Sequence, residues 1–384
     1  MSFRSPRIAR LTINLRPIVG SVATPSQRDP TANFVFRFCT IALILLLSGC
    51  ASVGQWWEGK REPSALEAAQ KAIRGEEPAI RSDTTAERSV VSPVSEEPLV
   101  YWETIGGGKI GNFITGGNDA RLERPVAVAV RGDFVYIVDA GQELVVRYDR
   151  ISGKLSTLVD LKGVAKGEIS DIYVAPDLSF YLADTFGRQV LYFDKKGSLR
   201  QTFRNLLNLV YPVGVWFDED SDTVLIADGQ LDHVLIFNKD GTLLSAVGGR
   251  GVEPGKFLNI TTVTEGPDGY YIAQRIGHHV QVLAKDGTYL YSFAQEGVIF
   301  PLAIAADNQQ RAFVADYLDN TIKVYERGRF VASIGKSGVG PGEFKRITDL
   351  WLDGDFLYVA DSLNGRIQIM RIAAVENLPS ILDR

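Results

Sequence analysis

The chain has 384 residues, of which 45% are hydrophobic and 10% aromatic, a composition that suits one large globular unit with extensions. Residues 1–49 carry six Arg and one acidic residue, which leaves 35 basic and 45 acidic residues from Cys50 onward, a net charge of −10. This acidic body is a poor electrostatic match to nucleic acid and to anionic lipid, so we expect no nucleic-acid partner.

The first predicted element is a short apolar run from Phe38 to Leu47, preceded by Arg37. Ten residues are too few to span a bilayer core of about 30 Å, but they suit the apolar region of a signal peptide. The chain's two cysteines, Cys39 and Cys50, lie in or beside this run, so the rest of the chain has no disulfide and no thiolate metal site.

The segment Leu-Ser-Gly-Cys at residues 47–50 resembles the lipobox of bacterial lipoproteins. The resemblance implies a signal peptide over residues 1–49, lipidation of Cys50, and attachment to a membrane through that lipid. Ala51 and Ser52 follow the cysteine where an Asp would favour the inner membrane, so the resemblance implies the outer membrane, facing the periplasm. An ordinary secretory signal is the alternative, and a translation start at Val35 would leave residues 1–34 out of the protein.

Residues 50–98 are rich in Glu, Ser, Pro and Ala, which predicts a flexible linker between the lipid anchor and the folded domain. Within it, the segment from Pro63 to Arg74 has the composition of a short helix. At the other end of the chain, residues 376–384 are expected to form a tail.

Residues 99–375 contain one segment repeated six times. Each copy has an apolar run and then a second apolar strand, which ends at an anchor residue and usually reads Ala-Asp there. The anchors are Asp139, Asp184, Asp228, Gln274, Asp316 and Asp361, at spacings of 45, 44, 46, 42 and 45 residues. A period in the forties that is built from short strands and turns predicts the blades of a β-propeller.

The repeats resemble the NHL family of six-bladed β-propellers. The best-matching copy runs from Trp351 through Leu-Tyr-Val-Ala-Asp361 to Ile369, and the others begin near Pro125, Ile169, Pro212, Ile260 and Pro301. The first strands are mostly continuous apolar runs, such as Val-Ala-Val-Ala-Val at 126–130, as expected for strands with a blade on each face. The predicted fold class is therefore an all-β, six-bladed propeller of NHL type.

The sixth copy stops after its third strand, at Arg366 to Ile372, and its missing fourth strand is expected at the other end of the domain in sequence. The segment from Tyr101 to Phe113 matches the fourth strands and following loops at 244–257 and 331–344. We therefore predict that residues 100–105 complete the sixth blade and close the ring, which removes an exposed sheet edge.

The recurring Asp residues and the glycine-rich loops are both interpreted as structural features. The recurring anchor Asp residues are separated by whole blades and cannot pair for acid–base chemistry, so we interpret them as caps that accept backbone N–H bonds. The glycine-rich loops at 106–111, 248–255 and 335–342 lack the Lys-Ser/Thr ending of a phosphate-binding loop and are interpreted as connections between blades. We assign no catalytic residue, no metal and no cofactor.

The copies differ most at the turn between their second and third strands, which makes this rim of the ring the candidate binding surface. A ligand-binding rim, with a metal or acid–base cluster of Asp232 and the three histidines, is weighed against simple solvated turns. The candidate rim residues are Glu143, Arg188, Asp232, His233, His278, His279, Asn320 and Arg366.

A second candidate site lies early in the inner strands, where Asp171, Thr262 and Asp349 occupy matching positions. These residues are expected at the mouth of the central channel, where two carboxylates could hold a cation; we favour backbone capping as their role.

The predicted function is a lipid-anchored envelope propeller that binds or scaffolds a protein or glycan partner without catalysing a reaction. A periplasmic propeller enzyme of the lyase or lactonase type, with a metal near the ring face, is the alternative. The first prediction follows from a clear anchor and scaffold combined with the absence of any nucleophile–base pattern.

Overall fold

The computed structural model describes residues 98–107, 121–277, 280–295 and 297–373. These residues form 24 strands and one short 3-10 turn, η2 (Ser362–Asn364), and none of their helical segments is long and apolar enough to cross a bilayer. Cys50, the predicted signal peptide, the linker up to residue 97 and the tail at 376–384 lie outside the described residues.

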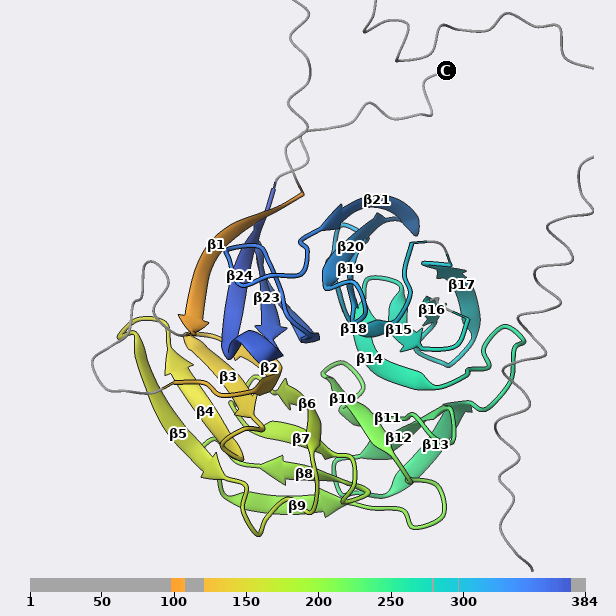
Figure 1. The fold of residues 1–384 in the computed structure, drawn as a ribbon. Coiled ribbons are helices and arrows are strands. Elements are labelled where there is room, and N and C mark those ends of the chain that lie inside the picture. Colours follow the sequence, from red (N-terminus) through yellow and green to blue (C-terminus); the bar gives the residue numbers. More distant parts are fainter. Residues whose placement is uncertain (1–97, 108–120, 278–279, 296, 374–384) are drawn as a thin grey trace, which may run out of the picture. The chain divides into compact units, whose positions relative to one another are not determined.

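The strands form six four-stranded antiparallel sheets, and each sheet is one blade (Figure 1). Blade 1 consists of β2 (Pro125–Arg131), β3 (Phe134–Asp139), β4 (Leu144–Asp149) and β5 (Lys154–Asp160). Blade 2 consists of β6 (Ile169–Val174), β7 (Phe180–Asp184), β8 (Gln189–Phe193) and β9 (Leu199–Phe203). Blade 3 consists of β10 (Pro212–Asp218), β11 (Thr223–Asp228), β12 (His233–Asn238) and β13 (Leu243–Gly248).

The other three blades repeat this order from the ring axis outward. Blade 4 consists of β14 (Ile260–Gly266), β15 (Gly269–Gln274), β16 (Val280–Leu283) and β17 (Tyr289–Phe293). Blade 5 consists of β18 (Pro301–Ala306), β19 (Arg311–Asp316), β20 (Thr321–Glu326) and β21 (Arg329–Ile334). Blade 6 consists of β22 (Ile347–Asp353), β23 (Phe356–Asp361), β24 (Arg366–Ile372) and β1 (Leu99–Gly106).

The predicted ring closure is confirmed. β1 pairs antiparallel with β24, from Leu99 opposite Ile372 to Gly106 opposite Arg366, and thereby supplies the fourth strand of blade 6. Figure 1 shows β1 beside β24 although the two strands come from opposite ends of the domain. Leu99 and Ile105 are almost fully buried, so the closing strand belongs to the core and does not merely cover an edge.

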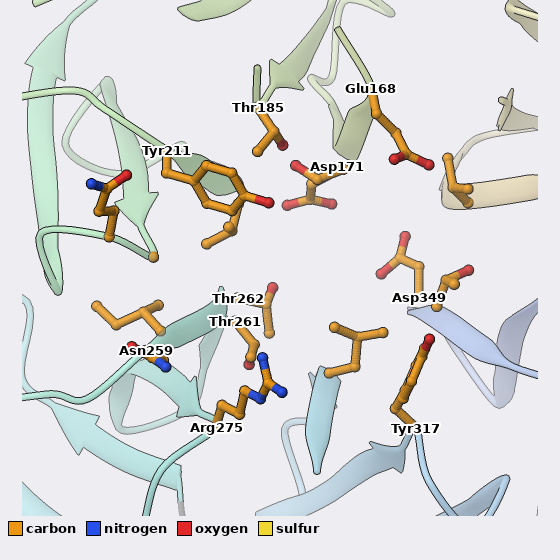
Figure 2. A pocket seen from close by; sticks show the side chains of 18 of the residues that line it. Glu168, Asp171, Thr185, Tyr211, Asn259, Thr261, Thr262, Arg275, Tyr317 and Asp349 are labelled. Carbon is orange, nitrogen blue, oxygen red and sulfur yellow. The ribbon is translucent and has the colours of Figure 1, made fainter. Parts of the chain in front are cut away.

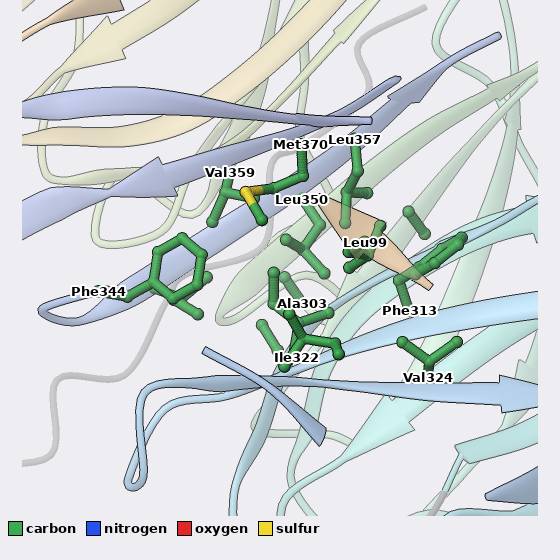
Figure 3. Packing of buried hydrophobic residues seen from close by; sticks show 14 of the residues in the cluster. Leu99, Ala303, Phe313, Ile322, Val324, Phe344, Leu350, Leu357, Val359 and Met370 are labelled. Atoms are coloured by element: carbon green, nitrogen blue, oxygen red, sulfur yellow. The ribbon is translucent and has the colours of Figure 1, made fainter. Parts of the chain in front are cut away.

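The hydrophobic core is divided into six clusters, each of which lies between two neighbouring blades. Figure 3 shows the cluster between blades 5 and 6, where Leu99 packs with Phe313 and Phe344. Burial on both faces of each blade explains why the first strands read as continuous apolar runs.

The anchor carboxylates act as caps, as interpreted from the sequence. Asp228, which is fully buried, accepts N–H bonds from Val210 and Tyr211 in the preceding loop and from Gln230 and Leu231 in its own turn. One side chain thus fixes a turn and an inter-blade loop at the same time, which accounts for its recurrence without a catalytic role.

Because the strands alternate in direction, the two faces of the ring carry different connections. We call the face that bears the turns between second and third strands, together with the inter-blade loops, the upper face. The opposite face, which bears the other two turns of each blade, is called the lower face.

Candidate functional site

A cavity of about 740 Å³ opens around the ring axis on the upper face. Every inner strand contributes the residue that follows its first residue, and the pairing register with the second strand shifts at this position in all six blades. A bulge of this kind re-aims a side chain without ending the strand. The six cavity-lining residues at these bulges are Val126, Ser170, Val213, Thr261, Leu302 and Thr348.

The three predicted channel-mouth residues, Asp171, Thr262 and Asp349, are brought together at the floor of this cavity. They line both the cavity and a smaller chamber of about 100 Å³. Figure 2 shows the carboxylates of Asp171 and Asp349 directed toward the open centre, with Thr262 across from them.

Each floor carboxylate caps two inner strands. Asp171 accepts the N–H of Ile172 on its own strand and that of Val215 on blade 3, both at 2.8 Å. Asp349 accepts the N–H of Leu350 and, across the blade 6–blade 1 boundary, that of Val128, also at 2.8 Å. The favoured capping role is therefore what these hydrogen bonds show, and the binding of a cation remains a prediction.

The floor carboxylates have an unusual electrostatic environment. Among the described residues, no Lys or Arg forms an ion pair with either of them. Burial raises the pKa of Asp171 to about 7, against the lowering effect of its two backbone hydrogen bonds. Burial first, and then the charge of Asp171, raise the pKa of Asp349 well above its usual range.

Aromatic rings line the smaller chamber, including those of Trp216 and Trp351. Trp216 stacks on Trp351 at a centroid distance of 5.8 Å, and Tyr173 packs edge-on against both. Along the inner strands the carboxylates therefore lie between the cavity of the upper face, which we call the funnel, and the rings of Trp216, Trp351 and Tyr173, which we call the aromatic plug.

The walls of the cavity carry two aromatic pairs. Phe186 meets Tyr211 at 5.8 Å, and Phe300 meets Tyr317 at 5.2 Å. The guanidinium of Arg275 lies 4.6 Å above the ring of Phe300. Figure 2 shows Tyr211 and Tyr317 reaching toward the centre from different sides, so the funnel presents aromatic rings around an acidic floor.

These aromatic residues were not among the site residues predicted from the sequence. Tyr211 and Phe300 immediately precede inner strands, whereas Phe186 and Tyr317 come one or two positions after anchor residues. Comparing the copies at those positions would have singled them out, because the same loops and turns meet at the axis.

The predicted rim lies farther from the axis, and none of its described residues lines the cavity. Glu143, Arg188, Asp232 and Asn320 all have φ between 54° and 59°, which is the left-handed region. The fourth position after the anchor needs this conformation to complete the turn; in blade 6 it is Gly365, with φ of 60°.

The remaining rim side chains hold nearby loops. His233 lies with Nε2 2.7 Å from the carbonyl of Asn208, and Arg366 donates hydrogen bonds to the Asp361 carboxylate and to carbonyls of the loop after β21. Asn320 accepts the N–H of Arg346. His278 and His279 lie outside the described residues, so the proposed cluster with Asp232 stays a prediction.

One acidic cluster outside the cavity already contacts a lysine. The carboxylates of Asp218, Asp220 and Glu265 lie close together on the lower face. The ammonium of Lys285 contacts all three, at 3.1, 2.8 and 2.7 Å. The cluster is therefore an ion-pair network supplied by the chain itself.

Comparisons with known proteins support the fold class. A sequence family described as "6-bladed beta-propeller" matches residues 303–368, and the "LVIVD repeat" matches residues 126–146. No curated protein matches the chain. The chain is a six-bladed β-propeller protein, and its NHL type remains a prediction.

Solved structures show the same architecture at low sequence identity. A protein of unknown function from Bacteroides thetaiotaomicron VPI-5482 is 17% identical, with a TM-score of 0.54 over 70% of this chain and 75% of that chain. A streptogramin B lyase is 12% identical, with a TM-score of 0.51 over 67% and 96%. A virginiamycin B lyase from Staphylococcus aureus is 12% identical, with a TM-score of 0.50 over 66% and 96%. At these identities the likeness establishes the fold alone.

Proposed function

We propose that this protein is a non-enzymatic, lipid-anchored propeller of the bacterial cell envelope that binds a protein or glycan partner on its upper face. Lipidated Cys50 would tether it to the outer membrane, facing the periplasm, through the linker at 50–98. The NHL-like repeats would supply the rigid ring.

The distribution of exposed apolar side chains is the observation that carries this proposal. Among the described residues, nine large hydrophobic side chains are exposed in turns and loops of the upper face, whereas Ile151 alone is exposed in a turn of the lower face. Exposed apolar surface that gathers on one face is typical of an interaction site. The nine residues are Phe186, Leu206, Leu207, Val252, Ile276, Ile299, Leu318, Val339 and Leu363.

Site-specific photocrosslinking in cells tests the proposal. A benzophenone amino acid placed at Phe186 or Leu318, which are 63% and 58% exposed, is expected to form a discrete adduct. The same group at Ile151, which is 81% exposed on the lower face, is the matched control and is expected to form none. Equal labelling from both faces, or none from the upper face, would contradict the proposal.

The lipid anchor is tested separately. Cys50→Ser is expected to shift the protein from the membrane fraction to the soluble fraction and to abolish incorporation of labelled fatty acid. Cys39→Ser is the control, because Cys39 lies within the apolar run and is expected to be removed with it. Unchanged membrane association of Cys50→Ser would refute the anchor.

A lyase- or lactonase-type enzyme is the second candidate, favoured by the two carboxylates with raised pKa at the floor of a large cavity. Two of the structurally similar proteins are lyases. Elemental analysis of the purified full chain tests it: a stoichiometric metal that is lost in an Asp171→Asn/Asp349→Asn double variant would support the enzyme, and a metal-free protein would count against it.

A further inference from the structure

We propose that the partner inserts a lysine or arginine side chain into the axial cavity, where its cationic group pairs with the carboxylates of Asp171 and Asp349. This inference rests on the proposed binding function of the upper face and adds the chemistry of the contact. The expected partner is a protein that carries a basic side chain at the tip of a loop.

The two floor carboxylates lack a cationic partner among the described residues. Asp171 and Asp349 receive only backbone N–H donors from the described residues, and none of those donors carries a charge. Burial penalises the charged form of both carboxyls and is the main cause of their raised pKa values, and the charge of Asp171 adds a second penalty for Asp349. A cationic group between them would remove both penalties.

The cations already present are held elsewhere. Arg275 lies over the ring of Phe300, and Nη1 of Arg250 is 3.7 Å from the buried Asp232 carboxylate. Glu168, the third acid of the lining, is paired with Arg124 at 2.6 Å. The two floor carboxylates are thus the acids of this cavity that lack a described ion pair.

The shape and the walls of the cavity suit an extended basic side chain. The funnel opens on the upper face, and Asp171, Thr262 and Asp349 line both the funnel and the smaller chamber. Aromatic rings such as those of Tyr211 and Tyr317 attract a cation and pack against the methylene stem behind it. The exposed apolar residues around the opening would contact the rest of the loop.

A variant of Thr262 tests whether the floor accepts a cation. Thr262 occupies the matching inner-strand position on blade 4 and faces the two carboxylates across the axis (Figure 2). Thr262→Lys in the full chain is expected to place an ammonium between them and to raise Tm by about 2–4 °C over Thr262→Gln at pH 7.5 and low salt. The gain should disappear when Asp171→Asn and Asp349→Asn are added. An equal or lower Tm for the Lys variant would overturn the inference.

Crosslinking in cells tests the partner. With the photoreactive group at Leu318, the adduct is expected to fall at least fivefold when Thr262→Lys fills the floor with an internal cation, and to persist in Thr262→Ser. A protein adduct of equal yield in both variants would overturn the inference and leave the proposed function standing. An adduct that is carbohydrate would overturn it as well. If no adduct forms when Thr262 is unchanged, that result would contradict the proposed function itself.

Discussion

At the residue scale, polar groups in this ring are divided between those that hold loops and those that face the cavity. The anchor Asp residues and the residues four positions later hold the turns. The recurrence of the first set and the variation of the second therefore reflect backbone geometry and not a shared chemical role. Asp232 is an exception among them. Its Oδ1 accepts the N–H of Ile260, but its buried Oδ2 has no hydrogen-bond partner and only a 3.7 Å contact with Arg250.

Asp232→Asn is expected to stabilise the protein at pH 8. Burial, followed by the nearby charge of Asp228, raises the pKa of Asp232 against the opposing effects of backbone hydrogen bonds and Arg250. A carboxyl whose folded pKa exceeds its unfolded pKa contributes stability below the unfolded pKa, and that stability is lost as pH rises through the folded pKa. The variant cannot ionise and should therefore gain Tm relative to wild type, by a few degrees, as pH rises from 4 to 8.

Blade 5 already has an Asn at the position equivalent to Asp232. Asn320 has the same left-handed backbone, accepts an N–H with Oδ1 and donates from Nδ2 to Ser337. A variant that is less stable than wild type at pH 8, in thermal melts across the pH range, would show that the Arg250 contact outweighs the burial of the charge.

Asp228→Asn is expected to have the opposite effect. All four N–H donors around Asp228 point at carboxylate oxygens, two at each oxygen. In an Asn side chain one of these oxygens becomes an NH₂ group, which cannot accept, so two N–H donors would lose their acceptor. Leaving buried donors unpaired costs about 1–3 kcal/mol each, so the free energy of unfolding should fall by at least that amount. Chemical denaturation of the two Asn variants side by side measures the contrast, and equal effects would refute the distinction between them.

At the scale of elements, the ring depends on one strand that comes from the far end of the domain. β1 supplies the outer strand of blade 6 and sends Leu99 into the core between blades 5 and 6. It also sends Ile105 into the core between blades 6 and 1. A single strand therefore contributes to two of the six core clusters.

Deletion of residues 98–108 is expected to destabilise the whole domain, because it uncovers β24 and opens both clusters. The milder Leu99→Ala should lower the free energy of unfolding by about 2–5 kcal/mol, since Leu99 is 1% exposed. Val100→Ala on the same strand, at 53% exposure, is the matched control and should cost less than about 1 kcal/mol. Unchanged cooperative thermal unfolding after the deletion would refute the closure as a source of stability.

At the scale of the molecule, the aromatic plug joins blades that do not touch through their sheets. Trp351 of blade 6 stacks on Trp216 of blade 3 and packs against three of the six core clusters. The plug lies below the funnel along the inner strands, on the side away from the upper face.

Trp351→Ala is expected to lower the free energy of unfolding by about 3 kcal/mol, because it removes a large ring from the place where several blades meet. The thermal transition should remain single, since the clusters share residues and unfold together. Trp102→Ala, on the outer strand at 54% exposure, is the control and should have a much smaller effect. A larger loss for Trp102 than for Trp351 would contradict this role of the plug.

Much of the fold was predictable from the sequence, and less of the site. The anchors at 139, 184, 228, 274, 316 and 361 predicted the blades, and the match of 101–113 to later loops predicted the closure. Thr262 and the two floor Asp residues were also placed together, because equivalent positions of inner strands meet at the axis. The rim residues could not be assigned in this way, because only the structure shows that their turns use left-handed backbone and hold loops.

The sequence by itself determined the repeat, the ring and the capping role of the anchors, because strand periodicity and turn chemistry are local properties that recur in register. Only the tertiary structure decided that Tyr211 and Tyr317 share a funnel with Asp171 and Asp349, and that no described cation pairs with that floor. The physical reason is that these contacts cross several blades, and the geometry of the closed ring, not the spacing along the chain, fixes which side chains meet at its axis.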